Sequence, residues 1–205
     1  MIHFYDNKDN VRILCGLANL SARNTITVQY IPSLSAEEIQ AKREEFLTKY
    51  VYETPEGKVN CLIGQWALSG QLNELAPDRL AEAIKGHTPN HMNLHHIVPL
   101  SWGGSNDPEN LVLISGRVHS FLHRKIYGLV NKKIKEYKDN LGKEPDKPIY
   151  ILLPKLPRVI QSIYDIENIF TPSEIKQFLA EEAAHVSYHG LKTKNVSLKE
   201  KQLTR

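Results

Sequence analysis

Hydrophobic and polar residues recur along the chain with periods that predict short strands and amphipathic helices. TITVQYI (25–31) alternates apolar and polar positions, which indicates a strand with one buried face. Ser35 and Glu38 have the spacing of a capping box, in which a hydroxyl and a carboxylate bind the free N–H groups that begin a helix. A helix is therefore predicted over 36–50.

Turn-forming and helix-ending residues divide the segments that follow. TPEGK (54–58) has the composition of a turn, and APDRLAEAIKG (76–86) predicts a short helix that ends at its glycine. GKEPDKP (142–148) indicates a linker, and IYILLP (149–154) predicts a short buried strand.

Two further helices are predicted in the second half of the chain. The first runs from Arg117 into the 130s, because apolar residues recur there at three- and four-residue intervals: Leu122, Ile126, Leu129, Val130 and Ile134. TPSE (171–174) combines a cap, a proline at the first helical position and a glutamate at the third, so the second helix is predicted to continue through about Tyr188. The last fifteen residues hold five Lys or Arg and one Glu, and we interpret them as a loose basic tail.

Composition and charge exclude several classes of protein. The net charge of +3 is mild, so a nucleic-acid partner would need a local basic surface. Cys15 and Cys61 belong to no C-x-x-C motif, which argues against a cysteine zinc site and favours two buried thiols. The N-terminus lacks the regions of a signal peptide, and no apolar run approaches the roughly 18 residues of a membrane helix. We expect a soluble, cytoplasmic protein with no membrane partner.

Histidines are concentrated in one short stretch, NLHHIVPLSWGGSNDPENLVLISGRVHSFLHRK (93–125). Five of the nine histidines lie between His91 and His123. His119 and His123 are four residues apart, so both project from one helix face and can bind one metal ion. His185 and His189 share this spacing, but no third ligand is evident near them in sequence, and we interpret them as solvated or capping residues.

The residues between these histidines predict a strand, a loop, a returning strand and a helix. His95 and His96 are neighbours on a strand and point to opposite faces, so one can face a metal while the other faces a substrate. Gly103-Gly104 permits a tight reversal, and Asp107-Pro108 a second turn. If these elements fold on one another, His95 lies beside His119 and His123. Asn110 begins the returning strand, and its amide can tie the loop that carries His96 to this strand.

These residues together form the pattern H-H-I-x-P-x-x-x-G-G-x-N-x-x-x-N-L…H-x-x-x-H, which resembles the HNH endonuclease family. One leucine of the family pattern falls a residue early, at Leu113. The paired histidines resemble those of phage and bacterial HNH proteins, and the metal end is similar to the three-histidine site of the colicin DNases. The resemblance covers about 35 residues and implies a ββα-metal core.

The resemblance implies a role for each residue that matches the motif. His96 matches the general base that activates water, and Asn110 the asparagine that orients the loop of the base. His95, His119 and His123 match the ligands of one divalent metal ion. Many family members have Asp at the position of His95 or Asn on the helix. The imidazoles found here favour Zn, Ni, Co or Mn over Mg, although Mg can still support activity.

The expected substrate is nucleic acid, and double-stranded DNA is the expected form. Seven Lys or Arg and one acid, Glu136, lie between Arg117 and Lys138. Arg117 and Arg124 are candidates to bind phosphate oxygens near the metal, with Lys125 beside them, although such a run is also typical of a solvated helix face. Trp102 is a candidate to stack on DNA or, alternatively, to anchor the loop. His91 is not expected to be a ligand.

The sequence thus predicts an α+β, mostly helical protein with three segments. Residues 1–88 form a mostly helical N-terminal region, 89–140 the HNH core, and 141–205 a C-terminal helical segment with the basic tail. A phage or mobile-element endonuclease, a defence nuclease and a toxin-type domain are the biological alternatives; the toxin is disfavoured because no delivery segment is evident. The alternative from another class is a non-catalytic nucleic-acid-binding module with a structural metal, which would be expected to use four protein ligands and no spare base.

Overall fold

The computed structural model describes residues 2–16, 25–30, 34–143 and 145–185. The chain divides into two compact units, Met1–Ile169 and Phe170–Arg205, and each is described by itself. Within the described residues, no helix has the length and apolar character needed to cross a membrane.

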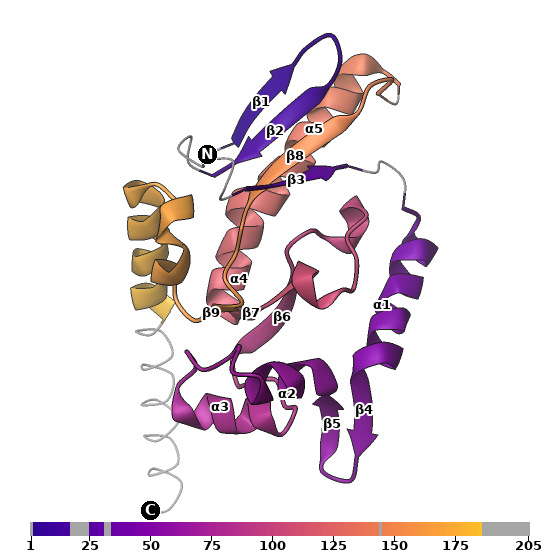
Figure 1. The fold of residues 1–205 in the computed structure, drawn as a ribbon. Helices are drawn as coiled ribbons and strands as arrows, with labels where there is room; N and C mark the ends of the chain where they lie inside the picture. The colour runs from indigo at the N-terminus through magenta and orange to yellow at the C-terminus, as the bar shows by residue number, and fades with distance from the viewer. Residues whose placement is uncertain (1, 17–24, 31–33, 144, 186–205) are drawn as a thin grey trace, which may run out of the picture. The chain divides into compact units, whose positions relative to one another are not determined.

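The N-terminal region contributes three strands to a four-stranded sheet with the order β1-β2-β8-β3 (Figure 1). Its members are β1 (Ile2–Asp6), β2 (Val11–Cys15), β3 (Thr25–Gln29) and β8 (Ile149–Pro154). β2 and β8 are parallel, and the other pairs are antiparallel. The strands predicted from TITVQYI and IYILLP are confirmed and pair with each other. Because β8 pairs with β2 and β3, the chain beyond the predicted core returns to the N-terminal region.

Helix α1 (Ala36–Tyr50) begins at the predicted capping box. The Glu38 amide donates to the Ser35 hydroxyl at 3.1 Å, and the Ser35 amide donates to the Glu38 carboxylate at 2.6 Å. The hairpin of β4 (Val51–Thr54) and β5 (Gly57–Asn60) follows, so the predicted turn is also confirmed. The capping bonds define where α1 starts.

A hydrophobic core lies under α2 (Cys61–Leu68) and α3 (Pro77–Ile84). The side chain of Asn60 caps α2, and Pro77 occupies the first turn of α3. Leu62, Ile63 and Trp66 from α2 pack in one cluster with apolar residues of the strand β7 (Leu111–Ser115). Met92, from the strand that carries His95 and His96, belongs to the same cluster, so this core supports that strand, because buried apolar area is the main source of folding stability.

The histidine-rich stretch folds as two antiparallel strands and a helix, as predicted. Its elements are β6 (Met92–His96), the 3₁₀ turns η2 (Leu100–Trp102) and η3 (Pro108–Asn110), β7 (Leu111–Ser115) and α4 (Gly116–Leu122). The helix continues through a π-helical turn, η4 (His123–Tyr127), into α5 (Gly128–Leu141). The two-residue β9 (Val159–Ile160) extends the sheet in the order β6-β7-β9.

The remaining elements complete the two units. The 3₁₀ segment η5 (Ile163–Ile169) buries three isoleucines of the first unit. The second unit holds a helix at 172–185, which starts with a hydrogen bond from the Glu174 amide to the Thr171 hydroxyl at 3.3 Å, as the TPSE motif predicts. The predicted end of this helix near Tyr188, His189 and the basic tail lie outside the described residues.

The α+β class is confirmed, but the description of the N-terminal region as mostly helical needs correction. β1 and β2 were not predicted, and a polar turn joins them. In that turn the Asn7 side chain accepts the amides of Asp9 and Asn10, both at 2.9 Å. The segment after residue 140 likewise contains β8 and β9 before its helix. Cys15 is buried as predicted, whereas Cys61 is only partly buried.

Candidate active site

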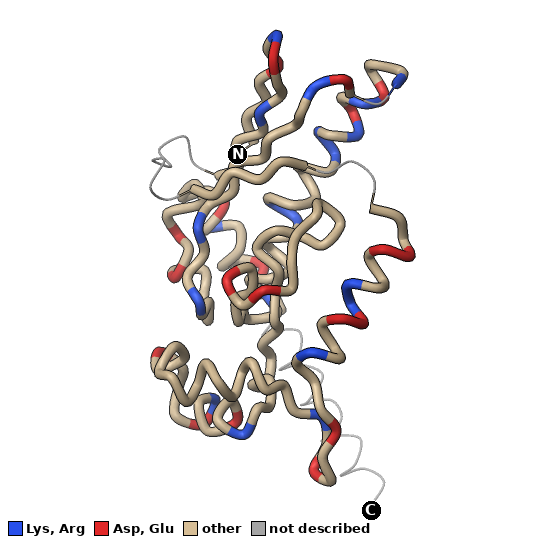
Figure 2. The backbone as a smooth tube through the Cα atoms, turned by 45° about the vertical axis from the view of Figure 1, so that its right-hand side comes forward, with Lys and Arg blue, Asp and Glu red and all other residues tan. Residues whose placement is uncertain are grey.

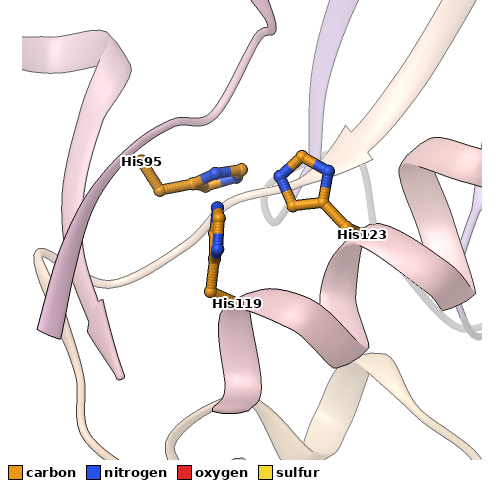
Figure 3. A group of neighbouring side chains, drawn as sticks. All are labelled: His95, His119 and His123. Carbon is orange, nitrogen blue, oxygen red and sulfur yellow. The ribbon is translucent and has the colours of Figure 1, made fainter. Parts of the chain in front are cut away.

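Three histidine side chains converge between strand β6 and the helix that follows β7 (Figure 3). His95 comes from β6, His119 from α4, and His123 from the first position of the π-helical turn. Their ring centroids are 4.9, 5.1 and 4.5 Å apart. One nitrogen from each ring lies within 4.8 Å of the other two, so the three can bind one metal ion. The predicted proximity of these residues is confirmed.

The protein environment favours the uncharged form of these imidazoles. Burial, followed by repulsion from His119, His123 and His96, lowers the pKa of His95 from 6.5 to about 3. Burial also lowers the pKa of His119, with a further contribution from His123, and burial alone lowers that of His123. Neutral imidazole is the form that coordinates metals, so the donor set fits a metal ion without prior loss of protons.

Tyr127 determines which nitrogen of His95 carries a proton. The Tyr127 hydroxyl donates to the Ile97 carbonyl at 2.8 Å and lies 3.1 Å from Nε2 of His95. A hydroxyl has one proton, and a carbonyl can only accept, so Nε2 of His95 must be the donor in the second bond. Burial raises the pKa of Tyr127, which keeps the hydroxyl protonated. Nδ1 of His95 is therefore the nitrogen that has a lone pair for a metal.

His96 stands at the end of β6 and has different partners from His95. Its Nε2 lies 3.0 Å from Oδ1 of Asn106, and the Phe46 ring of α1 meets its ring edge-on. Burial and the nearby charge of Lys42 lower the pKa of His96, while the hydrogen bond with Asn106 acts in the opposite sense. His96 is thus held near the three converging histidines without joining their cluster.

All four histidines line one open cleft of about 380 Å³. Its other walls come from β6, η2 and α1, and consist of Ile39, Arg43, Leu94, Pro99, Leu100 and Ser101. Arg43 is the cation in this lining, and its side chain is exposed. The cleft therefore combines possible metal donors, a neutral imidazole and a guanidinium group.

The loop between β6 and β7 is held by Asn110 in the way the sequence predicts. Its Oδ1 accepts the Val98 amide at 2.8 Å, and its Nδ2 donates to the carbonyls of Val98 and Ser105 at 3.0 and 2.8 Å. The predicted reversal at Gly103-Gly104 is also present. A Cβ on Gly104 would lie 2.0 Å from the Val98 carbonyl oxygen, so only glycine fits there.

The candidate role of Trp102 in stacking on DNA requires a correction. Its side chain is 1% exposed, and its Nε1 donates to Asn131 of α5 at 2.8 Å while its ring packs on Tyr127. A ring buried in this way cannot stack on a nucleobase, so the structure supports the alternative that Trp102 anchors the loop.

The basic residues predicted to bind phosphate lie on the helix but not in the cleft lining. The cationic groups of Arg124 and Lys125 lie 5.8 and 5.6 Å from the centre of the Phe121 ring. Farther along the helix, Lys133 and Lys132 pair with Glu136 at 2.8 and 3.9 Å, as on a solvated helix face. Arg117, Arg124 and Lys125 remain candidates for contacts outside the cleft.

Two further histidines considered in the sequence, His91 and His185, fall within the described residues. His91 is exposed, has a φ of 62°, and accepts the Gly116 amide through its backbone carbonyl. His185 lies in the second unit, at the described end of its helix. Neither is a member of the group of three converging histidines.

Comparison with known families agrees with the geometry of this stretch. Residues 82–124 match the family model described as HNH endonuclease. The chain carries an HNH domain. Members of this family are nucleases that act on nucleic acid, and they typically use a divalent metal. No curated protein and no solved structure matches the chain. The matched segment contains β6, β7, α4 and all four histidines of the cleft, whereas Arg43 lies outside it.

Three residues of the site were not singled out from the sequence. Asn106 is part of the H-H…G-G-x-N pattern, but the pattern does not indicate that its side chain bonds His96 and the Lys42 carbonyl. Tyr127 lies four residues after His123, and that helical spacing is its only local signal. Arg43 has no local signal, because Lys, Arg and Glu are interspersed along α1 as on any solvated helix (Figure 2).

Proposed function

We propose that this protein is a metal-dependent endonuclease that hydrolyses phosphodiester bonds in double-stranded DNA. The observation that carries the proposal is the position of His96. It lies in the same cleft as three converging histidines, has a lowered pKa, and does not belong to their cluster. A site that served only to stabilise the fold would be expected to use four ligands and to need no additional imidazole.

His95, His119 and His123 would hold the metal ion. When bound, the ion supplies Lewis-acid stabilisation of charge on the phosphate and the leaving oxygen, and three protein ligands leave coordination positions open for them. Three imidazoles favour Zn, Ni, Co or Mn over Mg. The protein contributes neutral donors and, through Tyr127, a defined tautomer of His95, as is usual where a ligating histidine donates its second N–H.

His96 would act as the general base. It accepts a proton from a water molecule, the water oxygen forms a bond to phosphorus, and one bridging P–O bond breaks. The departing oxygen takes a proton from solvent, so the products are a phosphate monoester and an alcohol. A base must be neutral before it can act, and burial of His96 favours that form at physiological pH.

Cationic side chains would hold the substrate backbone. Arg43 is placed to contact a phosphate in the cleft, since guanidinium binds phosphate oxygens in a bidentate manner. Arg117, Arg124 and Lys125 would contact phosphates farther along the strand. Such contacts bind nucleic acid without reading its sequence.

Cleavage of supercoiled and linear plasmid DNA in the presence of Mg, Mn, Co, Ni or Zn tests the proposal. We expect nicking or linearisation by the wild type. His96→Ala should lose most cleavage and keep its metal affinity in calorimetric titration, whereas His119→Ala should lose both. His91→Asn is the matched control, because it removes an imidazole of the same domain and places a residue that tolerates positive φ.

Two results would contradict the proposal. A protein that binds one metal ion and DNA but never cuts, with any of these metals or topologies, would be the binding module with a structural metal. Loss of metal by His96→Ala, with metal retained by His95→Ala, would reverse the roles of the two neighbours. A phage operon or a defence gene cluster around the gene would distinguish the biological alternatives.

A further inference from the structure

Helix α1, which lies outside the matched HNH segment, is connected to His96 by two consecutive hydrogen bonds. Nε2 of His96 lies 3.0 Å from Oδ1 of Asn106, and Nδ2 of Asn106 donates to the Lys42 carbonyl at 2.7 Å. Asn106 is 5% exposed, so water does not compete freely for its amide. These two hydrogen bonds thus link α1 to the imidazole of His96 through the buried side chain of Asn106.

The direction of each bond follows from the chemistry of its partners. The Lys42 carbonyl can only accept, so the amide nitrogen of Asn106 must face it. The amide oxygen of Asn106 then faces His96, and an oxygen of this kind also only accepts. Nε2 of His96 must therefore carry the proton, and Nδ1 is left with the lone pair.

Several contacts keep α1 in place against the loop. The Lys42 ammonium donates to the Gly104 carbonyl at 3.2 Å, two residues before Asn106. The Phe46 ring lies one helical turn after Lys42, with its centroid 6.2 Å from that of His96. Tyr50, one further turn along, is buried in the core cluster. One face of α1 therefore runs from the core to the loop that carries Asn106.

We propose that Asn106, oriented by the backbone of helix α1, is a positioning residue that holds His96 in the tautomer with the proton on Nε2 and Nδ1 open to water. This inference rests on the proposed function, because it assigns the nitrogen through which His96 acts. It also gives the N-terminal helix a role in the site. Without the Lys42 carbonyl, the Asn106 amide could rotate and present a donor to His96, which would favour the opposite tautomer.

Nitrogen-15 NMR of the histidine rings in the metal-free protein tests the tautomer directly, since protonated and unprotonated ring nitrogens have well-separated shifts. We expect His96 to show the proton on Nε2 in the wild type. Asn106→Asp keeps an acceptor toward His96 and should keep this tautomer. Asn106→Leu removes both bonds with little change in volume and should yield a mixture of tautomers, with cleavage reduced by about tenfold to a hundredfold and metal affinity unchanged.

Gln40→Leu is the matched control, because it removes an amide side chain from helix α1, where its bond to Glu44 is exposed, and leaves the contacts of His96 intact. It should retain the wild-type tautomer and cleavage rate. A wild-type His96 protonated on Nδ1 would overturn the proposal, even if Asn106→Leu proves unstable. An Asn106→Leu variant that folds and keeps both the tautomer and the wild-type rate would also overturn it. If the wild type never cuts, the proposed function fails on its own, while the ring shifts still decide whether Asn106 sets the tautomer.

Discussion

Asn110 pairs with Val98 as one strand residue pairs with another, but through its side chain. Its Oδ1 accepts the Val98 amide and its Nδ2 donates to the Val98 carbonyl, while the Asn110 backbone carbonyl accepts the Ile97 amide at 2.8 Å. The pairing of β6 with β7 is thereby continued past His96. Beyond His96, the Asn110 side chain makes the hydrogen bonds to Val98 that a backbone partner would make within the sheet. The loop with the candidate base therefore keeps a defined conformation.

Replacement of Asn110 should therefore damage the loop more than the fold. Asn110→Ala removes three side-chain hydrogen bonds, and we expect the free energy of unfolding to fall by about 1–3 kcal/mol. Cleavage should fall much further, while calorimetric metal affinity stays close to wild type. Asn93→Ala, at an exposed position on β6, serves as control in urea unfolding and plasmid cleavage. Unchanged cleavage by Asn110→Ala would show that the loop needs no such support.

Tyr127→Phe should weaken metal binding although Tyr127 touches no metal itself. The substitution keeps the ring but removes the hydroxyl that fixes His95, and loss of such a partner typically costs 10- to 100-fold in metal affinity. Titration calorimetry with Zn or Ni measures the effect. Tyr164→Phe, at an exposed position, should leave the affinity unchanged. Equal affinity for Tyr127→Phe and wild type would argue that His95 needs no help to orient.

The two glycines Gly104 and Gly64 should respond oppositely to alanine. Gly104→Ala places a Cβ 2.0 Å from a backbone oxygen, so the loop must move, and we expect a loss of more than about 2 kcal/mol of unfolding free energy. In α2, the Cβ of Gly64→Ala would make only an ordinary contact at 3.6 Å, and better helix propensity should make it neutral or stabilising by up to about 1 kcal/mol. Thermal unfolding of both variants decides the point, and a tolerated Gly104→Ala would contradict the close approach seen at this turn.

Stability of the metal-free protein should decrease as the pH falls below about 6.5. The pKa of His95 is about 3 in the folded protein and near 6.5 when unfolded, so the unfolded state binds more protons between these values. The contribution is fully present above the unfolded pKa and is lost as pH falls toward the folded one. The lowered pKa values of His119 and His123 act in the same direction. Urea unfolding in chelator at several pH values checks this, with His95→Gln expected to flatten the curve.

Arg43→Gln should weaken DNA binding about equally for all sequences. Loss of one phosphate contact should reduce the slope of log affinity against log salt by about 0.9. Lys49→Gln removes a cation from the same helix but not from the cleft, and should change the slope less. Charge reversal at Arg124 and Lys125 gives the corresponding test for the helix beyond the cleft. An unchanged slope for Arg43→Gln would remove it from the substrate contacts.

Local residue order was sufficient to predict those features that depend on interactions between residues close in sequence. The capping box of α1, the turn at 54–58 and the four-residue spacing of His119 and His123 each depend on atoms a few residues apart. The same holds for the convergence of His95 with the helix, because two antiparallel strands and a helix that follows the second strand directly have few ways to pack. The hairpin of β1 and β2 was missed, since its stability comes from pairing with β8, which lies more than 130 residues away in sequence.

The surroundings of the histidines depend on contacts that no local pattern contains. Trp102 has the same residue type whether it meets a nucleobase or the amide of Asn131, and only the packing of α5 against the loop buries it. Asn106 finds its acceptor 64 positions earlier in the chain, on a helix whose charged face resembles any solvated one. Hydrogen-bond direction and burial are properties of the neighbours in space, so which nitrogen of each histidine is free depends on how α1 and the π-helical turn pack around β6.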